Sequence, residues 1–396
     1  MDEYRTALRT NIWKLYVLSA VSTFGFAVPI FIPFQQEYGL SLQQAFLLQA
    51  AYALVLVVLE IPSGYLADRW GRRNTILTGS FALFLGMLTY AVTSGFWGFL
   101  LAESLLALGI SFHSGTTEAL TYDSLVELGE EKRYLRVNGH QGFLALGSKA
   151  VTSLLVGSLA TVSLRLPFWA DVLLFGIGIL TSLFLVEPHR HLLKETKHLT
   201  AMWRICRHAF LRNRALQGIL LLYTVVAAID VQIFWFLQPY QTSIALPLVF
   251  FGITNAAMCL LGALAYRYVH LFGKHAERMD VLFVISVILI LTCFGMSVVS
   301  SLWGLAFFIL EGMAFGLFDP LSSNIINRIT TSDVRATVLS LRSFTARLLF
   351  AALSPLLGYV ADVYSLSQAL LLTGIIGMAA LLLTFALAQT QQRKLD

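Results

Sequence analysis

Charged side chains are scarce in this sequence. Asp, Glu, Lys and Arg make up only 12% of its 396 residues, against roughly 25% in an ordinary soluble domain. Cysteine is scarce as well: there are three, and their spacing fits neither a disulfide framework nor a metal site. The sequence also lacks the H-E-x-x-H, G-x-S-x-G and G-x-x-x-x-G-K-[ST] patterns, which leaves no motif for metalloprotease, esterase or ATPase chemistry. We therefore expect neither an enzyme nor a protein that carries a cofactor or a metal.

Apolar sequence, in contrast, is abundant. Hydrophobic residues make up 57% of the chain. Runs of about 20 such residues, each long enough to cross a bilayer of about 30 Å, recur along its whole length. Twelve runs lie near residues 12–34, 41–66, 75–94, 96–120, 138–162, 168–187, 214–240, 244–268, 281–300, 301–327, 338–362 and 365–389. This pattern predicts an all-α membrane protein with twelve transmembrane helices.

The distribution of basic residues predicts the orientation of these helices. The net charge is +5, but the positive residues fill alternate loops instead of forming one patch for nucleic acid. The basic loops contain Arg69, Arg72 and Arg73; Lys132, Arg133 and Arg136; residues 190–214; Arg267, Lys274 and Arg278; and Arg328 and Arg335. The intervening loops carry only Arg165. By the positive-inside rule both termini are cytoplasmic, and we expect a multi-pass protein of the plasma (inner) membrane.

Fragments of the first half recur in the second half, which indicates an internal duplication. The segment 188–213 is the longest polar stretch and separates six apolar runs from six. We therefore expect two pseudo-symmetric six-helix bundles, residues 1–187 and 214–396, joined by a cytoplasmic linker. The corresponding fragments are Gly64–Arg69 and Gly262–Arg267, Glu103 and Glu311, and Lys149 and Arg347.

The loop at residues 64–73 carries the most specific motif. It reads Gly-Tyr-Leu-Ala-Asp-Arg-Trp-Gly-Arg-Arg and resembles G-x-L-a-D-R/K-x-G-R-R/K, the loop between the second and third helices of major facilitator superfamily transporters. In topology the resemblance covers nearly the whole chain. It implies that family's fold and a monomer whose two bundles rock to open a central cavity to each side in turn. The matching residues are Gly64, Leu66, Ala67, Asp68, Arg69, Gly71, Arg72 and Arg73.

The resemblance also implies a latch on the cytoplasmic side. If helices two and eleven meet there, Asp68 lies against the N-terminus of helix eleven and Arg335, and Glu60 lies against Arg342. The positive end of a helix favours a carboxylate, so this contact closes the cytoplasmic side and breaks when the halves rock. The alternative is that the basic residues of the loop act only as a static topology signal. Acidic residues that can extend the latch towards Arg72 or Arg73 are Glu118 and Asp123.

The seventh apolar run carries polar and aromatic residues along one side. Tyr223, Asp230, Phe234, Gln238 and Gln241 are spaced so that they stack on one face of a helix. Such a face suits an aqueous cavity that holds an organic solute, and helices one and seven line that cavity in the family. The alternative is a helix–helix contact held together by Gln and Asp.

Ionisable residues inside the apolar runs are the candidate site for coupling. A charge at the bilayer centre costs about 2.5–3.5 kcal/mol on insertion scales, so such residues are expected to face a cavity and a partner. Desolvation disfavours an ionised carboxylate, so either Asp230 or Glu311 can load and release a proton as the cavity faces each side. A permanent ion pair with Lys149 or Arg347 is the third interpretation. Glu103 lies closer to the outside.

Two departures from the family's drug exporters narrow the function. Helix four carries Glu103 where those exporters have R-x-x-q-G, and helix five lacks their G-P-x-x-G-G. The positive residues Lys149, Arg342 and Arg347 then favour an anionic or zwitterionic solute. We expect a secondary active transporter that moves a small organic solute by alternating access, coupled to protons, with export favoured over import. The alternatives are a metabolite importer or facilitator and a lipid flippase.

Overall fold

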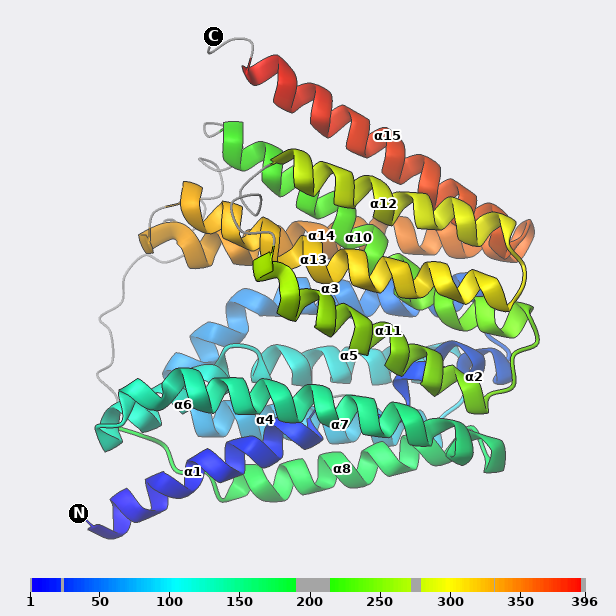
Figure 1. Cartoon of the computed structure of the whole chain (residues 1–396). Coiled ribbons are helices and arrows are strands. Elements are labelled where there is room, and N and C mark those ends of the chain that lie inside the picture. Colours follow the sequence, from blue (N-terminus) through cyan, green and yellow to red (C-terminus); the bar gives the residue numbers. More distant parts are fainter. Residues whose placement is uncertain (1, 23–24, 190–213, 272–278, 331, 393–396) are drawn as a thin grey trace. The chain divides into compact units, whose positions relative to one another are not determined.

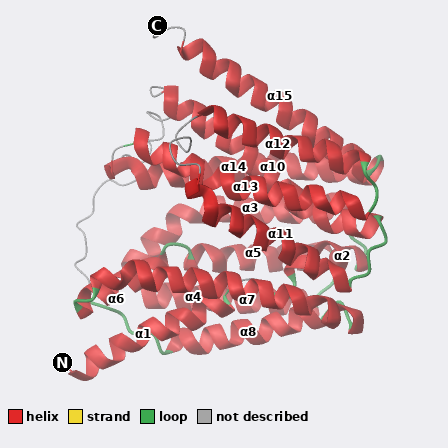
Figure 2. Cartoon of the chain, in the orientation of Figure 1, coloured by secondary structure: helices red, strands yellow, loops and turns green. Residues whose placement is uncertain are grey.

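The structure is a computed structural model that describes residues 2–22, 25–189, 214–271, 279–330 and 332–392. This part of the chain is almost entirely helical and contains no strand (Figure 2). The principal helices are α1 (Asp2–Val21), η1 (Val28–Ile30), α2 (Phe31–Glu37), α3 (Leu42–Trp70), α4 (Arg72–Val92), α5 (Phe96–His113), α6 (Thr116–Leu128), η2 (Glu131–Arg133), α7 (Tyr134–Val162), α8 (Leu166–Leu183), α10 (Arg214–Ser243), α11 (Val249–Arg267), α12 (Met279–Val298), η4 (Leu302–Gly304), α13 (Leu305–Ile329), α14 (Ser332–Val363) and α15 (Leu366–Gln392).

The chain folds as two compact units, and each is a helical bundle (Figure 1). In unit 1, α4 packs against α5 and α8, and α1 packs against α6, α7 and α8. In unit 2, α10 packs against α13, α14 and α15, and α12 packs against α13 and α15. Unit 1 comprises Met1–Leu40, Ala51–Leu193 and Pro247–Ala256; unit 2 comprises Ser41–Ala50, Lys194–Leu246 and Ala257–Asp396.

Two helices have their first turns in one unit and their remainder in the other. The start of α3 belongs to unit 2, where the Asp362 carboxylate accepts hydrogen bonds from the backbone N–H groups of Leu42 and Gln43 at 2.8 and 2.7 Å. The start of α11 belongs to unit 1, where Asn255 Nδ2 donates to Ser153 Oγ at 3.2 Å. These side chains satisfy polar groups that a helix end and an apolar interior would otherwise leave without partners.

The described helices include 11 candidate membrane spans. The remaining predicted span, which is the first in the sequence and lies near residues 12–34, is not one continuous helix. The structure divides it into α1, η1 and α2. The prediction of one continuous helix for this run is therefore wrong. The cause is Asp171 of α8, whose carboxylate accepts hydrogen bonds from the backbone N–H groups of Phe26 and Ala27 at 3.1 and 2.8 Å. Those N–H groups are then not available for helical bonds.

The fourth predicted span is also interrupted. The run 96–120 becomes α5 and α6, with Ser114 and Gly115 between them. Gly115 has φ +69°, a left-handed backbone conformation that glycine adopts without the steric cost that other residues meet. The chain therefore turns at this point and continues as α6 to Leu128, beyond the predicted end.

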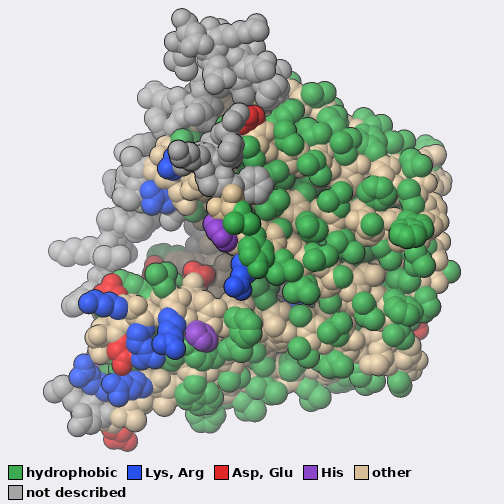
Figure 3. All heavy atoms as spheres, in the orientation of Figure 1, with side chains coloured by type: hydrophobic (Ala, Val, Ile, Leu, Met, Phe, Trp, Pro, Cys, Tyr) green, Lys and Arg blue, Asp and Glu red, His purple; other side chains and the backbone are tan. Residues whose placement is uncertain are grey.

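Large apolar side chains cover the outside of the helices. Trp97 and Trp303, for example, are 78% and 82% exposed. The face drawn in Figure 3 is mostly hydrophobic, and its charged side chains gather towards the left-hand end. Water would disfavour apolar surface of this extent, whereas a bilayer would cover it. The protein is therefore a multi-pass integral membrane protein.

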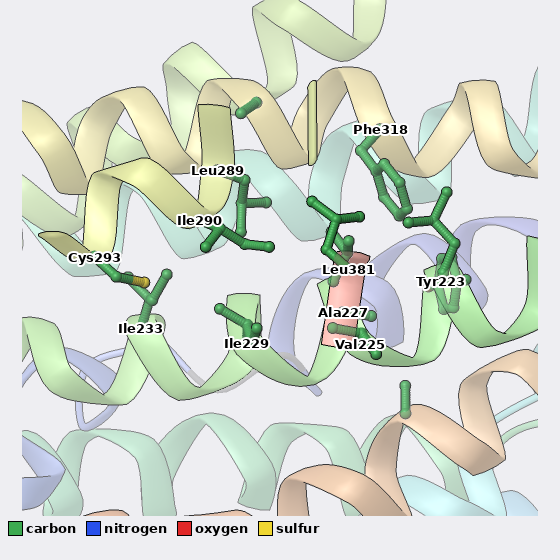
Figure 4. Close-up of a cluster of buried hydrophobic side chains, with 14 of the residues drawn as sticks. Tyr223, Val225, Ala227, Ile229, Ile233, Leu289, Ile290, Cys293, Phe318 and Leu381 are labelled. Atoms are coloured by element: carbon green, nitrogen blue, oxygen red, sulfur yellow. The ribbon is translucent and has the colours of Figure 1, made fainter. Parts of the chain in front are cut away.

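The core of unit 2 is built from facing rows of apolar side chains. Figure 4 shows Ile229 and Ile233 of α10 beside Leu289, Ile290 and Cys293 of α12, and Tyr223 beside Phe318. Helices α11 and α13 approach especially closely, because a Cβ atom added to Gly316 would lie 2.3 Å from the Gly262 carbonyl oxygen. Such small-residue contacts drive helix association inside membranes, where the hydrophobic effect is absent.

Candidate functional site

The two acidic residues that the sequence offered as alternative proton sites lie together in unit 2. Asp230 is half-buried on α10 and Glu311 is fully buried on α13. Their carboxyl groups lie within hydrogen-bonding range of each other and interact electrostatically. Two ionised carboxylates have only acceptor atoms, and neither oxygen of Glu311 has a hydrogen-bond donor within the described part of the chain. The two carboxyl groups can therefore form a hydrogen bond with each other only if one of them is protonated.

A second group of charges, on α13 and α14, lies next to this pair. Asp319 of α13 acts electrostatically on Asp230 and pairs with Arg342 of α14, with Oδ1 and Nη2 3.1 Å apart. The Tyr223 hydroxyl donates to the same Asp319 oxygen at 3.1 Å, and the Arg342 guanidinium lies 4.2 Å from the centre of the Tyr223 ring. Arg342 Nη1 also donates to the hydroxyls of Ser322 and Ser323.

The Arg342 contacts differ from the expected partner, Glu60. The guanidinium is held inside unit 2 by Asp319, a residue that the sequence analysis did not include in the site. Sequence spacing gives the depth of a residue along its helix, but not which neighbouring helix meets it at that depth. Asp319 lies two turns beyond Glu311, directly before Pro320, and that spacing was the available signal. Glu60 lies in unit 1, and its pairing with Arg342 stays a prediction.

The predicted stripe on α10 is largely buried. Tyr223, Gln238 and Gln241 are 7%, 2% and 1% exposed, and Phe234 is half-buried against Trp235. The C-terminal part of the stripe, with Gln238 and Gln241, is therefore buried like a helix–helix contact. The sequence analysis had kept such a contact as an alternative. Two members of the stripe meet ionisable groups of other helices: Asp230 meets Glu311, and Tyr223 meets Asp319. The roles of the two amides and of Phe234 in binding a solute stay predictions.

The remaining predicted site residues lie in different surroundings. Lys149 of α7 and Arg347 of α14 are both half-buried, in unit 1 and unit 2 respectively. Glu103 is buried in unit 1, where its Oε1 accepts a hydrogen bond from the Tyr90 hydroxyl at 2.6 Å, and Tyr90 in turn accepts one from Gln35 Nε2 at 2.8 Å. This chain ties α2, α4 and α5 together, so Glu103 has a structural task whatever else it does.

The predicted loop at residues 64–73 is mostly helix: Gly64–Trp70 form the last two turns of α3, and only Gly71 separates α3 from α4. The chain turns sharply at this glycine. Gly71 precedes the helix with φ +102°, and the Glu187 carboxylate accepts hydrogen bonds from the backbone N–H groups of Arg72 and Arg73 at 2.9 and 2.7 Å. A carboxylate at this position satisfies the free N–H groups and complements the positive end of the helix. Glu187 was assigned only as the last residue of the first bundle, so its capping role was missed.

The basic residues of the loop bind different partners. Arg72 pairs with Asp123 of α6 and donates to the Ala119 carbonyl, which confirms the predicted contact between Asp123 and this loop. Arg73 Nη2 donates to the Leu183 carbonyl at 2.8 Å. Asp68 and Arg69 are exposed, as is the first glycine of the motif, Gly64.

On the unit 2 side, Arg335 donates to the Asn327 carbonyl at 3.1 Å, at the end of α13. Its contact with Asp68 stays a prediction. The described residues hold no cluster of His, Cys, Asp or Glu suited to a metal ion. Cys259 and Cys293 are free thiols, while Cys206 lies outside the described residues.

Helical spans that carry ionisable groups in their interiors define the class: a transport protein of the membrane. The family model described as "Major Facilitator Superfamily" matches residues 13–348. The chain belongs to this superfamily, and the twelve-helix fold expected from the apolar runs and from the 64–73 motif is confirmed.

Known relatives are transporters. The chain is 25% identical over 195 residues to the inner membrane transport protein YajR of Escherichia coli (strain K12), covering 47% of this chain and 41% of that protein. It is 23% identical over 304 residues to the MFS-type transporter MJ1560 of Methanocaldococcus jannaschii, covering 74% and 75%. A crystal structure of a bacterial homologue of the human lysosomal transporter Spinster has a TM-score of 0.76 at 15% identity and covers 98% of both chains. That last likeness concerns the fold alone.

Proposed function

We propose that this membrane transporter couples the movement of a small organic solute to protons, and that the Asp230–Glu311 pair carries the proton. The observation that carries the proposal is the contact between these two carboxyl groups inside unit 2. The proposed direction of transport is export. In this proposal the protein lies in the plasma (inner) membrane, with both of its termini in the cytoplasm. It works as a monomer.

Electrostatics explains why the pair holds a proton. Two like charges at hydrogen-bonding distance repel strongly where water is scarce, so one carboxyl group stays neutral while the other ionises. The nearby Asp319 adds negative charge, but its own charge is balanced by Arg342. The proton belongs to the pair and not to either residue. This reading unites the two separate proton-site interpretations that the sequence left open.

Coupling requires that protonation favour one conformation over another. A ligand shifts a conformational equilibrium only through its differential affinity for the two states, and the same holds for a proton. Loss of the shared proton leaves two facing carboxylates, which separate or recruit a cation. Because Asp230 and Glu311 lie on different helices, α10 and α13, their repulsion acts directly on helix packing within unit 2.

The experiment is solute flux into proteoliposomes driven by an imposed pH gradient. Wild type accumulates a solute against its gradient, whereas Asp230→Asn and Glu311→Gln retain binding and downhill exchange but lose accumulation. Glu37→Gln, an exposed acid at the end of α2, serves as the matched control and keeps full accumulation. Gradient-driven accumulation that survives in both pair variants would remove the pair from the proton path.

A further inference from the structure

Unit 1 contains a cavity of about 410 Å³ that the sequence analysis did not anticipate. Its volume lies within the range of small-molecule sites, about 300–1,000 Å³. It is formed where α5 gives way to α6, with α1 and α7 as its other walls. The lining residues are Leu18, Ser19, Ser22, His113, Ser114, Gly115, Thr117, Glu118, Asn138, Gln141, Gly142 and Ala145.

The lining has a distinct chemistry. Hydroxyl and amide side chains dominate it, and Glu118 is its one acid. Neither Lys nor Arg occurs among the lining residues, and His113 supplies their only ring. A wall of this kind offers neither an aromatic platform for a flat apolar drug nor a cation for an anionic group. It suits a solute that brings hydroxyl groups and a positive charge.

Part of this hydrogen-bonding capacity is unused within the protein. The Thr117 hydroxyl oxygen is buried without a partner in the described part of the chain, and such groups in native proteins call for an explanation. Three other lining side chains are already engaged, and one of them is Ser19, whose hydroxyl donates to the Leu15 carbonyl at 2.8 Å. His113 Nε2 meets the Ser80 hydroxyl at 3.1 Å, and Gln141 Nε2 donates to Thr121 at 3.1 Å. They form a fixed wall around the groups that remain available.

The turn between α5 and α6 and a glycine of α7 leave space for this cavity. The turn at Gly115 ends α5 and starts α6, which places Thr117 and Glu118 in the first turn of a new helix. On α7, a Cβ atom added to Gly142 would meet nothing within 4 Å. The cavity is therefore open on the side of Gly142, and a larger side chain there would enter it without a clash against the backbone.

We propose that this cavity is a solute subsite that binds a small hydroxyl-rich amine, with Glu118 receiving the ammonium group and Thr117 and Asn138 receiving hydroxyl groups. The inference rests on the proposed transport function, whose coupling residues lie in unit 2. It assigns to this cavity, whose lining does not include Lys149, a preference for a cation. That preference is opposite to the preference for an anionic solute expected from Lys149, Arg342 and Arg347.

The test measures binding by the purified full chain in detergent, where no gradient exists. The probes are glucosamine and 1-amino-1-deoxysorbitol, their neutral parents glucose and sorbitol, and the anion gluconate, each followed by the shift of the thermal unfolding midpoint. At least one amine is expected to raise the midpoint in a saturable way, and its neutral parent and gluconate to raise it less. Equal shifts for amine and parent, or no shift with either amine, would overturn the proposal.

Variants locate the bound amine. Glu118→Gln should weaken its binding roughly tenfold, as expected for the loss of a charged hydrogen-bond partner. Gly142→Leu should abolish binding by filling the cavity. Gly139→Leu is the matched control, since Gly139 also lies on α7, with nothing within 4 Å of an added Cβ atom, but outside the lining. Equal binding by the Gly142→Leu and Gly139→Leu variants would place the amine elsewhere.

A second measurement does not depend on the choice of probe. In a variant without native cysteines, Asn138→Cys should react faster with a cationic than with an anionic methanethiosulfonate, and Glu118→Gln should remove that preference. Equal rates with both reagents would contradict the assigned charge of the site. Neither test involves Asp230 or Glu311. Failure of the subsite and failure of the proton pair therefore give different results.

Discussion

Arg342 illustrates how a single charged side chain is accommodated inside a membrane span. Its guanidinium meets one carboxylate, two serine hydroxyls and the face of a tyrosine ring. Each contact compensates part of the cost of removing the charge from water. The same contacts use up the positive charge, so Arg342 is less available to an anionic solute than its position in the sequence suggested.

This pairing predicts a specific pattern of stability. Asp319→Asn should lower the free energy of unfolding by about 1–3 kcal/mol, because it leaves the guanidinium without its carboxylate. The double variant Asp319→Asn, Arg342→Gln should be more stable than the sum of the two single losses predicts. Thermal unfolding midpoints of the four proteins in one detergent measure this, and strictly additive losses would show that the ion pair contributes nothing.

For single residues, the sequence identifies candidate site residues better than it predicts the contacts between them. Asp230 and Glu311 were both recognised because a carboxyl group in an apolar run is costly. Their contact was not, because it depends on the rotation of α10 and α13 about their axes. Asp171 was missed for a related reason: its partners are backbone N–H groups of Phe26 and Ala27, which carry no sequence signal.

Among the helices, the N-terminus of α4 depends on a residue far away in the chain. Glu187 caps it, while Gly71 makes the turn. Glu187→Ala should cost about 1 kcal/mol, as other lost caps do, and should accelerate hydrogen exchange in the first turn of α4. Exchange at the opposite end of α4, near Val92, is the internal control and should not change. Unaltered exchange at Arg72 and Arg73 would mean that the cap does not stabilise this turn.

The contact between α11 and α13 makes a sharper packing prediction. Gly316→Ala places a methyl group against the Gly262 backbone, so the helices must separate, at a cost of about 1–3 kcal/mol. Gly218→Ala on α10 is the matched control, because nothing lies within 4 Å of an added Cβ atom there. That control should be neutral or should stabilise by up to about 1 kcal/mol. Equal unfolding midpoints for the two variants would contradict the close approach.

The helices themselves follow from the sequence more directly than their interruptions do. Apolar runs of span length predict the helices because the bilayer leaves no other way to satisfy the backbone. The breaks at Gly115 and between α1 and η1 depend on one backbone turn and one buried carboxylate. Hydropathy averages over windows longer than either feature, so both predicted spans were drawn as continuous.

For the whole molecule, the exposed Asp68 is the residue predicted to latch the cytoplasmic side closed in the outward-open state. Asp68→Asn should shift the equilibrium towards the state that is open to the cytoplasm, because it removes the charge that the N-terminus of α14, the eleventh predicted span, attracts. Cysteine probes on the cytoplasmic side should then be labelled faster than in wild type. Arg69→Gln separates this latch from a static topology signal, since it should leave the labelling rate unchanged. Identical rates in wild type and Asp68→Asn would locate the latch elsewhere.

The order of the spans was predictable at this scale, because the apolar runs mark them along the sequence. The orientation that the alternating basic loops indicate stays a prediction. The sequence did not predict that two helices begin in one unit and continue in the other. The starts of α3 and α11 each belong to the unit opposite the rest of their helix. Their anchors, Asp362 and Ser153, lie in distant parts of the sequence.

The central claim is that the Asp230–Glu311 pair holds one proton at neutral pH, and infrared spectroscopy of the purified protein tests it most directly. A protonated carboxyl group has a C=O stretching band that ionised carboxylates lack and that shifts in D₂O. We predict such a band in wild type at neutral pH, reduced in the double variant Asp230→Asn, Glu311→Gln and retained in Glu37→Gln. A spectrum in which the double variant shows the same band as wild type, or in which neither shows it, would contradict the account.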